Sequence, residues 1–72
     1  MREASIVAIL RGGKGKAQSE WMDESRAQEE LERITNELND PHGPQFISLG
    51  ASATVNRADV IAVELNHPPF VA

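Results

Sequence analysis

The sequence predicts a small α+β domain in which one amphipathic helix packs on one face of a small antiparallel sheet of four to five strands, in the order ββαββ. Three observations support this fold class. Apolar segments rich in β-branched residues lie near both ends of the chain, at 5–10 and 60–65. Apolar residues recur at helical spacing between 27 and 38, and stretches rich in glycine and proline separate the segments. At 72 residues the chain has room for a single domain.

The N-terminal segments predict a β-hairpin. Residues 5–10 are apolar at both odd and even positions, which suits a strand covered on both faces. The glycine-rich stretch 11–16 follows, and residues 16–22 then alternate weakly in polarity, which favours a second strand returning through the turn. The alternative is a helix that begins at Ser19, with the glycine-rich stretch at its N-terminus, where backbone N–H groups bind anions.

The middle of the chain predicts one helix, over 24–39. Four apolar residues recur three or four positions apart: Ala27, Leu31, Ile34 and Leu38. Ser25 with Gln28 fits a capping box at the start. Asp40-Pro41 ends the helix, because proline lacks a backbone donor and fixes its own φ.

The last third of the chain predicts short strands separated by turns. The strands are expected at 46–49, 53–55 and 60–65. The turns are expected at 50–52 and 56–59, where Asn56 and Asp59 can bond the local backbone. Residues 66–72 are expected to form an extended proline-containing tail of the same single domain, 1–72.

The glycine-rich stretch 11–16 does not fit the known phosphate-binding motifs. A P-loop requires a glycine five residues before its Gly-Lys pair and Ser or Thr after it, and Leu10 and Ala17 stand there instead. A dinucleotide-binding fingerprint requires a glycine where this chain has Gln18. The sequence therefore predicts a hairpin turn with solvated lysines.

Charge is distributed unevenly along a chain whose net charge is −4. The first 16 residues are basic and the helical region is acidic, so Arg11, Lys14 and Lys16 form a candidate anion or nucleic-acid contact. The acidic total argues against nucleic-acid binding, since it repels a phosphate backbone. The acidic helix residues indicate either a face that docks on a basic partner or a solvated face: Asp23, Glu29, Glu30 and Glu37.

The residue types needed for catalysis or metal binding do not form a convincing set. The chain has no cysteine and no tyrosine, and its two histidines, His42 and His67, lie beside prolines at spacings unrelated to a metal motif, even with Asp40 added. We expect no enzymatic activity, no metal and no cofactor. Glu64, in the last apolar strand, is either desolvated or reaches water at the strand end.

The apolar run 6–10 is too short for a signal peptide or a membrane span, so we expect a cytoplasmic protein without a membrane partner.

The two end strands carry apolar residues on both faces, and one helix covers only one face of a sheet. The second face must be closed by curvature of the sheet, by the tail 68–71, or by another subunit. We expect self-association, and the expected interface residues are Val7, Ile9, Phe46, Val60, Ala62 and Phe70.

The segments Phe46-Ile47-Ser48-Leu49 and 55–64 (Val-Asn-Arg-Ala-Asp-Val-Ile-Ala-Val-Glu) resemble the closing half of many small proteins encoded by phages and mobile elements. The resemblance covers about residues 24–65 and implies a ββαββ layout and a viral or plasmid origin, without an active site. The leading hypothesis is a non-enzymatic, self-associating interaction protein that acts on a host protein. The alternatives are a nucleic-acid-binding accessory protein that uses residues 11–16, and a small-ligand sponge or inhibitor with its pocket between subunits.

Overall fold

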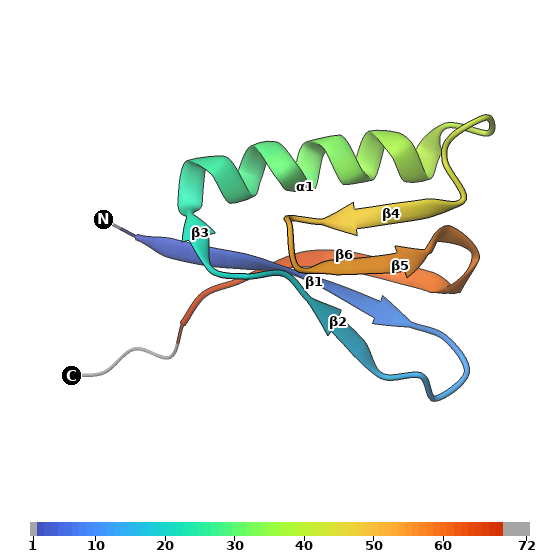
Figure 1. The fold of residues 1–72 in the computed structure, drawn as a ribbon, viewed down its shortest axis with the longest axis horizontal. Helices are drawn as coiled ribbons and strands as arrows, with labels where there is room; N and C mark the ends of the chain where they lie inside the picture. The colour runs from blue at the N-terminus through green and yellow to red at the C-terminus, as the bar shows by residue number, and fades with distance from the viewer. Residues whose placement is uncertain (1, 69–72) are drawn as a thin grey trace.

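The computed structural model describes residues 2–68 and confirms the α+β fold class (Figure 1). One helix packs against the sheet, and the strands form two antiparallel sheets, of four and two strands, where the sequence suggested one. The elements are β1 (Glu3–Leu10), β2 (Lys16–Gln18), β3 (Met22–Asp23), α1 (Glu24–Asn39), β4 (Phe46–Leu49), β5 (Ala53–Asn56), the 3₁₀ helix η1 (Arg57–Asp59) and β6 (Val60–Asn66).

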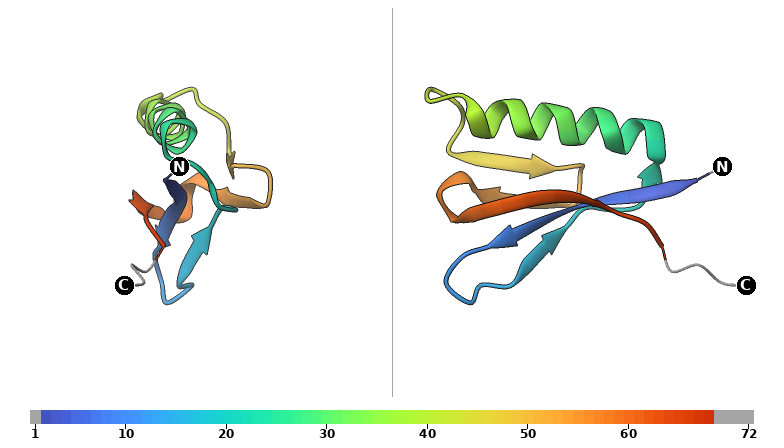
Figure 2. Two further views of the ribbon diagram at one scale, coloured as in Figure 1. Left: turned by 90° about the vertical axis from the view of Figure 1, so that its left-hand side faces the viewer. Right: turned by 180° about the vertical axis from the view of Figure 1, so that it is seen from behind.

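Strand β1 is the centre of the larger sheet. It pairs with β2 through Val7–Ile9 and with β3 through Glu3 and Ala4, so these two short strands share one edge of β1. Strand β6 pairs along the other edge. Residues 4–8 are all buried, which confirms the predicted strand covered on both faces. Figure 2 shows α1 along one side of this sheet, with the β4–β5 hairpin beside them.

The expected second strand over 16–22 is divided into β2 and β3 because Ser19 takes over the pairing with Ile6. The backbone N–H of Ser19 donates to the Ile6 carbonyl at 2.9 Å, while its hydroxyl, and not its carbonyl, accepts from the Ile6 N–H at 2.8 Å. Because a side-chain hydroxyl replaces a backbone carbonyl here, the ladder of backbone hydrogen bonds along β1 is interrupted, and β2 ends before β3 begins. The alternative of a helix beginning at Ser19 is wrong.

Helix α1 has the predicted bounds, but its N-cap is Asp23 and not the expected Ser25 capping box. The Asp23 carboxylate accepts from the Ser25 backbone N–H at 3.2 Å and from the Ser25 hydroxyl, and these hydrogen bonds lower the pKa of Asp23. At the other end, the Arg57 guanidinium donates to the carbonyls of Leu38, at 3.3 Å, and Asp40. A cation from η1 therefore satisfies the C-terminal carbonyls of α1.

The core lies between α1, the helix side of the larger sheet and the β4–β5 hairpin. Its buried members come from every one of these parts: Ala4, Ile6, Ala8, Met22, Ala27, Ile34, Ile47, Leu49 and Val55. Strand β4 alternates exposed and buried residues, as a strand with one covered face should. The hairpin is therefore held to the rest of the fold mainly by one row of apolar side chains.

Two carboxylates fix the β4–β5 turn. Glu20 accepts hydrogen bonds from the Ala51 backbone N–H, at 3.0 and 3.1 Å, and from the Ser52 hydroxyl at 3.1 Å. Glu30 accepts from the Gly50 N–H at 3.0 Å and pairs with Arg33, which also donates to the Ser48 carbonyl at 2.7 Å. The turn is thus tied to both α1 and the segment between β2 and β3.

These contacts predict acid-sensitive stability. Backbone N–H groups of Glu20 itself and of Ala51 lower the pKa of Glu20, and hydrogen bonding to Arg33 lowers the pKa of Glu30. A lowered folded-state pKa means that the stabilisation is complete above the ordinary value of 4.5 and is lost as the pH falls through the folded-state values. We expect the urea midpoint to fall on acidification below this value, and to fall less steeply in Glu20→Gln. The same acid response in both proteins would contradict a role for Glu20.

Strand β6 is one residue longer than the predicted 60–65 and contains a register shift typical of a β-bulge. Ile9 lies opposite Ala62 but Leu10 lies opposite Val60, so Ile61 is the extra residue and remains 62% exposed. Val60 therefore packs on the core side, with Val63 and Leu65. Strict alternation along this strand predicts that Val60 and Ala62, both expected at the interface, lie on one face. The structure places them on opposite faces, because alternation does not hold across the bulge.

Candidate functional site

The outer edge of β6 is the first candidate site. The backbone N–H and C=O of Ile6 point to Ser19, on the β2 side of β1. Successive residues of a strand point these groups to opposite edges, so the N–H and C=O of Val7 point to β6. Val7 lies opposite Glu64, so the backbone groups of Glu64 point inward to β1. Those of its two neighbours, Val63 and Leu65, therefore point to the outer edge of β6. No described strand pairs with this edge among residues 2–68.

The outer edge of β6 has few of the features that usually prevent strands from pairing between molecules. Residues 60–66 contain no lysine, arginine or proline, and their one charged residue is Glu64. Ile61 and Ala62 are both exposed. The bulge at Ile61 lies at one end of the strand, and Glu64 is the one charge. An edge without a paired strand therefore extends from Ala62 to Asn66.

The reverse face of the larger sheet is less apolar than expected. It carries Val7, Ile9 and Ala62 from the predicted interface, but their neighbours are polar: Ser5, Lys16, Gln18, Glu64 and Asn66. Val7 is 7% exposed, and Gln18 donates a hydrogen bond to Ser5 at 2.8 Å. Because the centre of this face is already covered by its own side chains, the edge offers more unpaired surface than the face.

The remaining expected interface residues do not join this surface. Phe46 is 58% exposed on the separate two-stranded sheet, where it lies opposite Asn56. Val60 is half-buried on the core side. Phe70 lies outside the described residues, as do residues 69–72 of the expected tail 66–72.

The basic residues of the glycine-rich stretch do not gather into one anion-binding surface. The stretch is a hairpin turn in which Gly12, Gly13 and Gly15 have positive φ. Lys14 pairs with Asp59 at 3.0 Å, and Lys16 lies opposite Ile9 at the start of β2. Arg11 lines a separate pocket. The predicted hairpin turn is confirmed.

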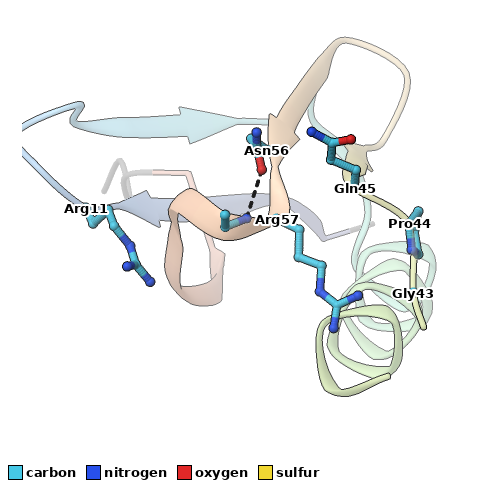
Figure 3. Close-up of a pocket in the computed structure, with 7 residues that line it drawn as sticks. Arg11, Gly43, Pro44, Gln45, Asn56 and Arg57 are labelled. Carbon is cyan, nitrogen blue, oxygen red and sulfur yellow. Dashed lines mark hydrogen bonds between the residues drawn. The ribbon is translucent and has the colours of Figure 1, made fainter. Parts of the chain in front are cut away.

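The pocket beside Arg11 is the second candidate site (Figure 3). It is open, has a volume of about 410 Å³, and is formed by three segments that are distant in sequence. Its lining residues are Arg11, Gly43, Pro44, Gln45, Asn56, Arg57 and Ala58. Sequence reasoning named only Arg11 as a site residue, because nothing in the sequence indicates that the loop after α1 and the corner before η1 meet there.

The other candidate residues have local partners. His67 Nε2 lies 2.7 Å from Glu24, whereas the Asp40 side chain accepts from the His42 backbone N–H at 2.9 Å. No group of three potential metal ligands occurs within residues 2–68. Glu64 is exposed, so the structure places it in water.

The acidic face of α1 is partly used inside the molecule. Glu30 and Glu37 both bind Arg33, whose pKa is raised by these carboxylates, and Asp23 is the N-cap. Glu29 is exposed. Only part of the expected docking face therefore keeps unpaired charge.

Among residues 2–68, no helix has the length and apolar character required to cross a membrane.

Comparisons with protein-family models, with curated proteins and with solved structures found no match to the chain.

Proposed function

We propose that the protein is a non-enzymatic interaction protein that self-associates by antiparallel pairing of β6 with β6 of a second copy. The observation that supports this proposal most directly is the unpaired outer edge of β6 with its exposed apolar residues. Pairing about a twofold axis joins two four-stranded sheets into one and satisfies the backbone groups of Val63 and Leu65.

Charge selects the register of this pairing. A twofold axis at Glu64 places Glu64 opposite its own copy, and like charges directly opposite each other destabilise a strand pair. An axis at Val63 instead places Glu64 opposite Ala62 of the second copy, and Ile61 opposite Leu65. The Val63-centred register therefore avoids repulsion and brings the exposed isoleucine against an apolar neighbour.

Ile61→Lys is expected to weaken self-association by at least about tenfold, because a charged side chain on an edge strand opposes pairing. Ile61 is 62% exposed, so the substitution should leave the monomer folded. Sedimentation equilibrium at micromolar concentrations measures the association constant, and circular dichroism measures the fold.

The matched control is Thr54→Lys, which places the same charge at an exposed position of β5, in the two-stranded sheet that does not include β6. Glu64→Gln tests the register: it should change association little if Glu64 faces Ala62, and strengthen it if two Glu64 side chains face each other. A wild-type protein that remains monomeric at these concentrations would refute the proposed function.

A further inference from the structure

Helix α1 lies beside the outer edge of β6. It packs against both β1 and β6. Glu24, in the first turn of α1, lies 2.7 Å from Nε2 of His67, the residue that follows β6. The left-hand view of Figure 2 shows α1 over these two strands, with the β4–β5 hairpin on the other side of the molecule. One side of α1 is therefore directed beyond the outer edge of β6.

The two sides of α1 differ in charge. The side towards the hairpin carries Glu30, Arg33 and Glu37, which form ion pairs, and Arg33 also donates to the Ser48 carbonyl of β4. The side towards β6 begins at Glu24 and continues at spacings of four and three residues, and after Glu24 it carries no charge. We call its next three residues the lateral stripe of α1: Gln28, Leu31 and Thr35.

The lateral stripe is open to a further contact. Gln28 and Thr35 are exposed, and Leu31 is half-buried. The Thr35 hydroxyl donates to the Leu31 carbonyl at 2.8 Å, so it needs no partner outside the helix. Glu32 borders the stripe on its solvent side and is exposed. The stripe can therefore be covered without burying a charge or leaving this hydroxyl unpaired.

Pairing of β6 with β6 of a second copy determines the distance between the two helices. The twofold axis of such a pair is perpendicular to the sheet, so both copies of α1 lie on the same face and run antiparallel. Because α1 lies over β1 and β6, its axis is about one strand spacing, roughly 4.8 Å, from the twofold axis. The two helix axes are then about 10 Å apart, and helices pack directly at about 8–10 Å.

The surface beneath the two helices is apolar. Val63 and Leu65 pack on the core side of β6, the side that α1 covers. In the Val63-centred register the same two residues of the second copy continue this surface across the junction. Contact between the helices therefore shields from water an apolar strip that strand pairing alone would leave open.

We propose that the lateral stripe of α1 is a second part of the self-association surface and packs antiparallel against the same stripe of a second copy. This inference rests on the proposed pairing of β6, which brings the helices side by side. An unrelated exposed strand could offer the backbone pairing but not the matching uncharged stripe. The stripe therefore makes β6 selective for a second copy of this chain.

The test compares two substitutions at adjacent positions of α1. Thr35→Glu places a carboxylate in the stripe, near the same substitution in the second copy, and should lower the association constant by at least about tenfold. Asn36→Glu is the matched control, because it places the same charge at an exposed position outside the stripe. It should change association little. Sedimentation equilibrium measures the association constant, and circular dichroism reports whether the helix is intact.

Replacement by leucine tests the same contact in the opposite direction. Thr35→Leu adds apolar area to the stripe and should strengthen association, whereas Asn36→Leu should not. Equal effects at positions 35 and 36 would overturn the helix contact, and the pairing of β6 would stand if Ile61→Lys still weakens association. A monomeric wild-type protein would refute both proposals.

Discussion

Gly43→Ala is expected to lower the free energy of unfolding by about 2–3 kcal/mol, as overpacking of a tight contact does. A Cβ at this position would lie 2.5 Å from the backbone oxygen of Glu37 and 2.8 Å from Arg57 Nη1. The backbone oxygen belongs to the last turn of α1 and cannot move without distorting it. The substitution therefore separates the loop after α1 from the cation that satisfies the helix end.

Urea unfolding followed by circular dichroism measures this loss. Gly13→Ala is the matched control: a Cβ there meets no atom within 4 Å, and its positive φ is the one source of strain. That strain costs about 1–2 kcal/mol. Gly43 has no positive φ, so a Gly43→Ala protein as stable as the wild type would contradict the predicted close contact with Glu37.

Leu49→Ala is expected to lower the free energy of unfolding by about 2–5 kcal/mol, the range for truncating a fully buried leucine. Leu49 is 0% exposed and belongs to the one row of side chains that attaches the β4–β5 hairpin to the core. A single core in a domain below about 70–80 residues rarely provides more than about 3–5 kcal/mol, so this change removes most of the stability.

Thermal unfolding at fixed protein concentration measures the effect of Leu49→Ala, and a concentration series separates it from any change in association. Ser48→Ala is the control, because Ser48 is exposed on the same strand and its backbone carbonyl still accepts from Arg33. A small effect of Leu49→Ala would show that the hairpin is held by the hydrogen bonds of Glu20 and Glu30 and not by apolar packing.

The regular elements were predictable where local pattern and tertiary packing agree. Apolar residues at both odd and even positions predicted β1, and helical spacing predicted the bounds of α1. The glycine-rich stretch predicted the hairpin turn. The exceptions arise where one side chain replaces a backbone partner. The Ser19 hydroxyl ends β2 by bonding Ile6, and the Asp23 carboxylate caps α1 two residues before the expected serine.

The candidate sites were less predictable because they depend on register and on contacts between distant segments. The extra residue at Ile61 moves Val60 to the core side, and a polarity pattern that assumes strict alternation does not detect it. The apolar character of β6 was visible, but its position at the edge of the sheet was not. The pocket joins residue 11 to residues 43–45 and 56–58, and no local signal links them.

The pairing of β1 with β6 also determines when the fold can be completed. These strands lie at opposite ends of the described chain, so their contacts have a large sequence separation, and such contacts form slowly because a long loop must close first. During translation β1 is made early and lacks its partner on this edge until β6 leaves the ribosome. Completion of the larger sheet therefore waits for β6, and until then the growing chain exposes one edge of the apolar strand at its centre.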